Sequence, residues 1–285
     1  MWLTFAFGSA FFAGITAVLA KIGIKNTDST VATAIRTIII LLFSWFMAGI
    51  TGAVSGISSI TGKTLLFLIL SGLATGGSWL CYFKALQVGD VNKVAPIDKS
   101  STILTMLLAF IILNEQLNAI KIICMILIGI GTYLMITKKQ TDKETKGFSW
   151  FWYAVFSAVF ASLTSILGKI GISGIDSNLG TAIRTIVVLV MAWIMVFVTR
   201  KQNEIKKINT KNLLFICFSG LTTGLSWLCY YKALQDGSAS VVVPIDKLSI
   251  LVTIAFSYFI LKEKLTKKSL LGLLLMTIGT LLLVI

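Results

Sequence analysis

Ten ionisable side chains lie inside stretches of sequence that are otherwise apolar, and they form two sets of five with the same residue types. The first set is Lys21, Arg36, Lys84, Asp98 and Lys99, and the second is Lys169, Arg184, Lys232, Asp246 and Lys247. An ionisable group in the middle of a bilayer costs about 3 kcal/mol on insertion scales, so such groups usually face a cavity or a partner. Because each set holds four cations and one acid, it favours binding of a carboxylate or phosphate group.

The arginines and the two acids have the most clearly defined possible roles. Arg36 is the deepest cation of its set, about two turns into its predicted helix, where a side chain reaches the membrane surface least easily. Asp98 and Asp246 are the only acids of their sets, which makes them candidates for proton coupling. The alternative is structural, because the same charges could pair with one another and only hold helices together.

Aromatic residues accompany these charges in the repeated segment SWLCY. Trp79 and Trp227 lie in mid-span, away from the interfacial belts where tryptophan is enriched, and Tyr82 and Tyr230 follow on the same helix face. Such aromatics suit a pocket wall that stacks on an organic solute, although helix packing is the commoner use. The predicted substrate-binding residues are Arg36, Trp79, Tyr82, Lys84, Asp98, Arg184, Trp227, Tyr230, Lys232 and Asp246.

The two sets exist because the chain is an internal duplication with a spacing of 148 residues. Residues 71–87 and 219–235 are identical at 14 of 17 positions, and the PIDK segments at 96–99 and 244–247 keep the same register without a gap. We predict a first five-helix repeat over 1–137, a linker loop over 138–148 and a second repeat over 149–285.

The composition indicates that these repeats lie in a membrane. The chain is 56% hydrophobic and 13% charged, about half the charged fraction of a soluble domain. Ten runs approach the 20 apolar residues that span a bilayer. They are 2–24, 30–50, 64–87, 93–113, 120–137, 149–172, 178–199, 212–235, 240–261 and 269–285. The predicted fold class is an all-α integral membrane protein with ten transmembrane helices as two inverted five-helix repeats, since an odd number of spans turns the second copy over.

Loop charge predicts how these helices are oriented. The connections after spans 1, 3, 5, 7 and 9 carry 15 basic residues, and we call this side the basic face. The opposite side, the neutral face, carries only Lys63 and Lys121. Since cytoplasmic loops are enriched in lysine and arginine, the basic face is predicted to be cytoplasmic and both termini outside. Its expected partner is anionic lipid of the inner leaflet of the cytoplasmic membrane.

Other classes of site are disfavoured. Histidine is absent, and the four cysteines lie in apolar runs without CxxC or Cys/His spacing, so no metal or disulfide framework is indicated. The sequence contains no nucleotide-binding loop and no nucleophile–base pattern, which argues against an enzyme. No cofactor and no nucleic-acid partner are expected, and the chain is expected to be a monomer or homodimer.

Each repeat closes with an acid in the turn before its last span, Glu115 or Glu263, and a glycine late in that span, Gly131 or Gly279. This ending resembles the EamA repeat of the drug/metabolite transporter superfamily. In that family each repeat closes with a Gly-Glu turn and a glycine-rich final span. Glu115 and Glu263 match the acid, Gly131 and Gly279 match the late glycine, and Asn114 and Lys262 replace the glycine before the acid. The resemblance covers the whole chain and implies ten helices around a central cavity with alternating access. Most ten-span relatives keep both termini in the cytoplasm, which differs from the orientation that loop charge predicts here.

The sequence therefore predicts a secondary active transporter that moves a small organic solute, either amino-acid-like or an anionic metabolite. One alternative is an exporter of cationic drugs, which the excess of in-span cations disfavours. The other is a lipid-handling protein or a membrane scaffold.

Overall fold

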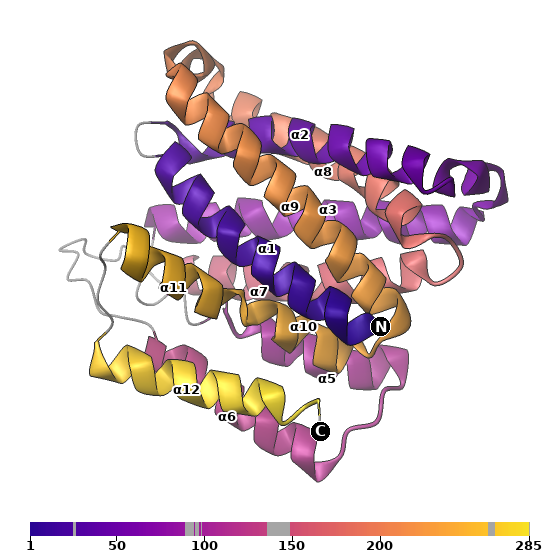
Figure 1. Ribbon diagram of the computed structural model, residues 1–285, viewed down its shortest axis with the longest axis vertical. Coiled ribbons are helices and arrows are strands. Elements are labelled where there is room, and N and C mark those ends of the chain that lie inside the picture. The colour runs from indigo at the N-terminus through magenta and orange to yellow at the C-terminus, as the bar shows by residue number, and fades with distance from the viewer. Residues whose placement is uncertain are drawn as a thin grey trace. The chain divides into compact units, whose positions relative to one another are not determined.

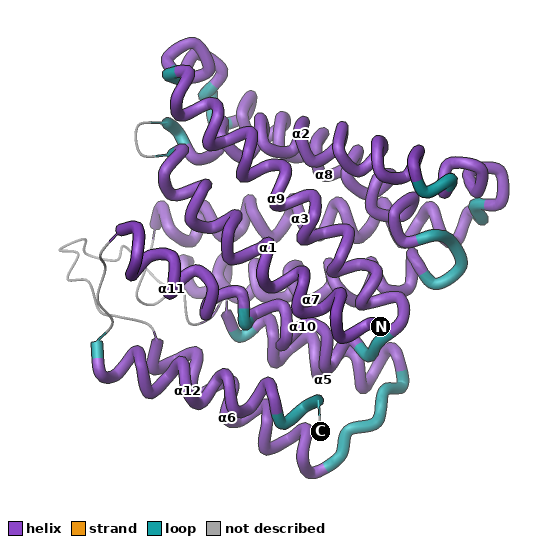
Figure 2. Tube along the Cα trace, viewed as in Figure 1, coloured by secondary structure: helices purple, strands orange, loops and turns teal. Residues whose placement is uncertain are grey.

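The computed structural model describes residues 1–24, 27–88, 94, 97, 99–135, 149–261 and 266–284. These residues form helices joined by short loops, and none of them lies in a strand (Figure 2). The first half contains α1 (Trp2–Gly23), α2 (Ser29–Ile50), η1 (Ala53–Ser59), α3 (Gly62–Val88), α5 (Ser101–Leu113) and α6 (Ala119–Met135). The second contains α7 (Ser149–Ile172), α8 (Ser177–Val198), η2 (Gln202–Lys207), α9 (Thr210–Asp236), α10 (Ala239–Lys247), α11 (Ser249–Leu261) and α12 (Lys267–Leu281).

Seven helical segments are long and apolar enough to cross a membrane, which confirms a multi-pass helical membrane protein. Six of them lie in α1, α2, α3, α7, α8 and α9, and the seventh is Ala239–Phe256. α5 and α6 are shorter apolar helices, and α12 has 15 residues. The count of ten spanning helices stays a prediction.

The described chain divides into two compact units that both draw on the two sequence repeats. The first unit consists of Met1–Leu73, Leu167–Gly237 and Asp246–Lys262. The second consists of Ala74–Ile166, Ser238–Ile245 and Glu263–Ile285. Segments of the two copies are thus packed together inside each unit.

In the first unit α2 lies antiparallel to α8, the equivalent helix of the other repeat (Figure 1). Asp28, just before α2, forms an ion pair of 3.2 Å with Lys201, just after α8. At the other end the amide of Asn178 donates to the hydroxyl of Thr51 over 3.4 Å. The start of each helix therefore lies beside the end of its copy.

α1 and α9 also run in opposite directions within this unit, and small polar residues join them. The hydroxyls of Ser9 and Ser226 are 3.3 Å apart, and those of Thr16 and Thr222 are 2.8 Å apart. Position increases along α1 while it decreases along α9, as antiparallel packing requires. The two helices pack closely here because each hydroxyl has a hydrogen-bond partner on the other helix, within surroundings that are otherwise apolar.

In the second unit the final helices of the repeats, α6 and α12, pack at their glycines. A Cβ atom on Gly131 would lie 2.6 Å from the carbonyl oxygen of Gly272, so any side chain there would push the backbones apart. Gly279 makes the corresponding approach to Cys124. The two late glycines singled out in the sequence are therefore contact points between helix backbones.

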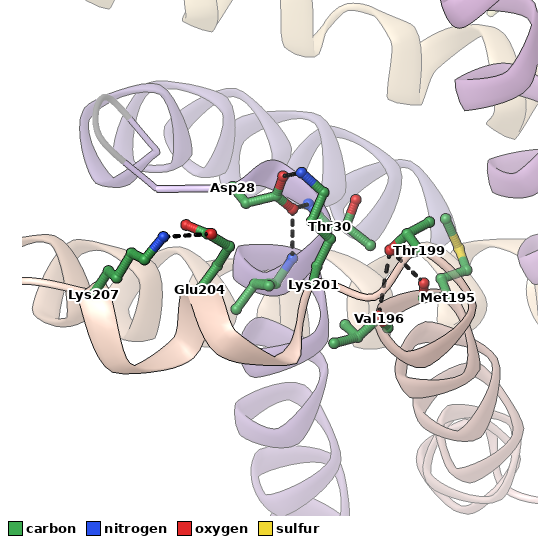
Figure 3. Close-up of polar contacts among 9 residues, drawn as sticks. Asp28, Thr30, Met195, Val196, Thr199, Lys201, Glu204 and Lys207 are labelled. Atoms are coloured by element: carbon green, nitrogen blue, oxygen red, sulfur yellow. Dashed lines mark hydrogen bonds and ion pairs between the residues drawn. The ribbon is translucent and has the colours of Figure 1, made fainter.

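The ends of α2 and α8 show how the loop charges are used. Asp28 and Asp176 accept backbone N–H bonds at the starts of α2 and α8, which confirms both as N-caps. Arg200 adopts a left-handed φ of 55° after α8, and the amide of Lys201 then bonds to the carbonyl of Val196 over 2.9 Å. This closed helix end is a Schellman motif. It brings Lys201 to Asp28, as Figure 3 shows.

The environment of Asp28 sets the direction of its pKa. Partial burial acts to raise the pKa of this carboxyl, but the hydrogen bond from Lys201 and those from the amides of Val31 and Thr30 outweigh burial and lower it. A lowered folded-state pKa contributes stability that is present above the ordinary pKa of aspartate, about 3.9, and is lost as pH falls through the folded value.

Replacing Asp28 with alanine should lower the free energy of unfolding by about 1–2 kcal/mol at pH 7, because both the cap and a partly exposed ion pair are removed. The difference from the parent chain should shrink as the pH falls below about 4, because the carboxylate of the unfolded chain takes up a proton there while the lowered pKa keeps the folded one ionised to lower pH. Unfolding in mixed micelles at both pH values measures this. Asp176→Ala, which removes a cap without that lysine contact, is the control. A difference that is equally large at pH 7 and pH 3 would contradict the assignment.

Candidate functional site

The most deeply buried cation of the described chain is Arg184 on α8, which is 2% exposed. Its Nε donates to the Ser71 hydroxyl on α3 over 3.0 Å. The guanidinium lies over the rings of Trp227 and Tyr231 on α9, 5.0 and 4.8 Å from their centroids. The phenol of Tyr231 also hydrogen-bonds to Ser71. Two aromatic faces and a hydroxyl thus partly compensate this charge inside the first unit.

Arg36, the equivalent residue on α2, has a different environment. Its Nη2 donates to the Thr223 hydroxyl on α9 over 2.8 Å. Its Nε is buried and has no hydrogen-bond partner in the described part of the chain. The ion pairs found among the described residues do not involve it either. A buried N–H of a charged group without an acceptor is costly, and it is the kind of group that a bound anion satisfies.

Asp246 lies where a predicted helix is broken. Within the predicted span 240–261, α10 ends at Lys247 and α11 begins at Ser249, while Ala239–Phe256 as a whole is long and apolar enough to cross a membrane. The Ser9 hydroxyl donates to Oδ1 of Asp246 over 2.6 Å, and Lys247 Nζ is 3.7 Å from Oδ2. Helices that break within the membrane are typical of solute and ion sites in transporters, because chain ends there present free polar groups.

The start of α11 has a counterpart in the first repeat at the same register. α5 begins at Ser101, 148 residues before Ser249, directly after the first PIDK segment. Asp98 of that segment lies outside the described residues, so its predicted role is not tested.

The remaining predicted site residues have mixed environments. Trp227 contacts Arg184 directly, and the ring of Tyr230 meets that of Tyr231 edge to face. Lys232 instead forms an ion pair of 3.1 Å with Asp236 on its own helix. In the second unit Trp79 is half-buried, Lys84 is exposed, and Tyr82 packs against an apolar cluster around Ala85 and Ala154.

The sequence analysis missed Tyr231, Ser71 and Ser9. Tyr230 was chosen because it stands three residues after Trp227, but the fourth position shares the same helix face and belongs to Tyr231. The two repeats also differ there, since Phe83 is the equivalent of Tyr231. Ser71 and Ser9 recur 148 residues later as Ser219 and Ser157, but this repetition does not predict their roles, which come from helices that meet only in the fold.

The contact between Arg184 and Tyr231 should appear as an energetic coupling. In a double-mutant cycle of Arg184→Met and Tyr231→Leu, we expect a coupling of about 1–2 kcal/mol, the size of a desolvated cation–π contact. Unfolding of the four proteins in mixed micelles measures it. The same cycle with Tyr230→Leu is the control and should give a coupling near zero. Equal couplings for the two tyrosines would contradict the assignment.

Comparisons with known proteins agree with this architecture. The model of the EamA-like transporter family matches residues 1–137 and 148–285. An uncharacterized transporter in the cobO 3′ region of Sinorhizobium sp is 43% identical over 134 residues, covering 47% of this chain and 95% of the relative. An uncharacterized protein of Methanocaldococcus jannaschii is 35% identical over 83 residues, covering 29% of this chain and 61% of that protein.

A solved protein crystal structure has the same fold with little sequence identity. It superposes with a TM-score of 0.77 at 13% identity, covering 98% of this chain and 95% of the other. With the family match over both repeats, the chain belongs to the EamA-like transporter family of the drug/metabolite superfamily, and it is a membrane transporter and not an enzyme.

Proposed function

We propose that the chain is a secondary active transporter for a small organic solute with an anionic group, amino-acid-like or an anionic metabolite. The solute crosses the cytoplasmic membrane by alternating access between two inverted repeats of five helices. The single observation that carries the solute class is Arg36, whose buried Nε has no acceptor and whose guanidinium has no carboxylate partner among the described residues.

The energetics favour an anion as the missing partner. Desolvating one charge costs several kcal/mol unless an opposite charge and hydrogen bonds compensate it. A guanidinium offers a planar fork of N–H donors that matches a carboxylate or phosphate. The hydroxyls of Thr223 and Thr16, 3.5 Å apart, provide further polar groups beside Arg36. A solute carboxylate bound there converts a destabilised cation into a paired one.

A cationic drug is a poorer fit for the described site. Asp246 already accepts a hydrogen bond from Ser9 and lies beside Lys247, so the carboxylate is partly neutralised. The same carboxylate, with its copy Asp98, remains the candidate for proton coupling. In that role its protonation would weaken the contacts with Ser9 and Lys247 and free the broken helix to move.

The antiparallel pairing of α2 with α8 and of α6 with α12 supports the inverted arrangement. We predict that residues 55 and 203, on equivalent connections of the two repeats, lie on opposite sides of the membrane. Reporter fusions or single cysteines at these positions, tested with an impermeant reagent, measure this. The basic side, with residue 203, should be cytoplasmic. If both positions react from one side, the inverted repeats and the transport cycle built on them are wrong.

Transport itself should depend on Arg36. In proteoliposomes, Arg36→Gln should lower the flux of the solute by roughly tenfold or more, the cost of losing charge-assisted hydrogen bonds. The solute is first chosen by a thermal-shift screen of amino acids, organic anions, phosphorylated metabolites and amines, since a ligand raises the stability of the form that binds it. Lys206→Gln, on exposed η2, is the matched control and should transport normally. Full transport by Arg36→Gln, or stabilisation by amines alone, would overturn the proposal.

A further inference from the structure

Glu115 makes an unusual set of contacts for a residue in a short connection between helices. Its Oε1 accepts the backbone N–H of Ala239 over 2.6 Å. Its Oε2 accepts the backbone N–H of Ser240 over 3.0 Å and the Ser240 hydroxyl as well. All three residues belong to the second unit. One carboxylate of the first repeat therefore holds the first two residues of α10, which belongs to the second repeat.

These bonds satisfy groups that a helix cannot satisfy internally. The first N–H groups of any helix lack partners within it, and they carry the positive end of its dipole. Ala239 and Ser240 are both buried, so water does not replace Glu115 easily. α10 has nine residues, and a helix that short depends on contacts at its ends.

The backbone before Glu115 explains how the side chain reaches α10. Asn114 adopts the left-handed conformation, with φ 52° and ψ 33°, where α5 ends. Asparagine is the residue that best tolerates this conformation after glycine. The replacement of the family glycine by Asn114 therefore keeps the turn that directs Glu115. Lys121 supports the arrangement, because its Nζ donates to the Ser240 hydroxyl over 3.0 Å and to the carbonyl of Gln116 over 2.8 Å.

The contact differs in kind from the other acidic caps. Asp28 and Asp176 cap residues two or three positions further along their own helices, so motion of one repeat against the other leaves them intact. Glu115 and Ser240 are 125 positions apart and come from different repeats. Any movement of α10 relative to the first repeat must stretch or break these bonds.

We propose that Glu115 is a positioning residue that latches α10, the half-helix that carries Asp246, and that the latch opens during each transport cycle. This inference rests on the proposed function. Both Glu115 and the start of α10 lie in connections that are predicted to be on the neutral face, so we expect the latch to favour the form that is closed on that side. Loss of the latch then biases the transporter towards the form that is open to the neutral face.

Two native cysteines can report this bias. Cys81 on α3 and Cys229 on α9 are equivalent positions of the repeats, and both are half-buried. With the predicted orientation, Cys229 lies towards the neutral face and Cys81 towards the basic face. In a background with Cys124→Ala and Cys217→Ala, Glu115→Ala should raise the ratio of Cys229 to Cys81 labelling by N-ethylmaleimide about fivefold, the size expected from losing one helix cap. A merely structural loss would raise both rates together.

Further variants keep the test decisive if Glu115→Ala does not fold. Ser240→Ala removes only the hydroxyl, and Glu115→Gln retains one acceptor, so each should shift the ratio less and in the same direction. Asp176→Ala, which removes a cap within one repeat, should leave the ratio unchanged. An unchanged ratio in the Glu115 and Ser240 variants overturns the latch, as does an equal shift in Asp176→Ala.

The labelling needs no solute, so its outcome is separate from that of the transport assay. An unchanged ratio in a chain that still transports refutes the latch alone, whereas absence of solute flux in the parent chain refutes the proposed function.

Discussion

Charge buried among apolar helices is the constraint on which the rest of this structure depends. Arg184 meets it with two aromatic rings and the Ser71 hydroxyl, all supplied by neighbouring helices. Arg36, its duplicate, has the Thr223 hydroxyl and a buried Nε without an acceptor. Duplication produced the same residue twice, but the described contacts place aromatic rings over the guanidinium of Arg184 and not over that of Arg36. Arg36, which lacks those rings, is for this reason the proposed site of an anionic ligand, because its charge has already been desolvated during folding.

The duplication also constrains which residues can change. The relative from Sinorhizobium matches over 134 residues that make up 95% of its length and 47% of this chain, so it is about one repeat long. Each half of this chain has about that length. The equivalent helices of the two halves pack antiparallel to each other, α2 on α8 and α6 on α12. Helix-contact positions such as Gly131 and Gly279 are kept in both copies, because either one meets the backbone of the other final helix. The loops differ in charge between the copies, and a loop contact such as that of Lys201 with Asp28 has no ionic counterpart at the equivalent position.

Local features of this fold could be predicted from the sequence, whereas contacts between helices could not. Asp28 and Asp176 were identified as caps because a cap depends only on the next few residues. The all-helical membrane class follows from composition and run length. The interruption at Leu248 was not predicted, although Pro244, Asp246 and Lys247 interrupt the apolar run 240–261 just before it, because such residues do not by themselves fix where a helix ends. Tyr231 and Ser71 were missed for another reason, because their role is set by Arg184 on a third helix.

Loop charge has a structural role beside the orientation proposed for it. The equivalent of Arg200 in the first repeat is Gly52, and both adopt a left-handed backbone, with φ of 55° and 72°. Glycine takes this conformation freely, whereas an L side chain costs roughly 1 kcal/mol there. Arginine at that turn is therefore not explained by backbone preference, but a basic loop accounts for it. The next residue, Lys201, stands where the first repeat has Ala53 and forms an ion pair with Asp28, and this contact between α8 and α2 offsets part of that conformational free energy.

At the opposite end of the same helix pair, Asn178 and Thr51 make a neutral contact. The two ends of one symmetric pair thus differ in charge, as the orientation proposed from loop charge predicts.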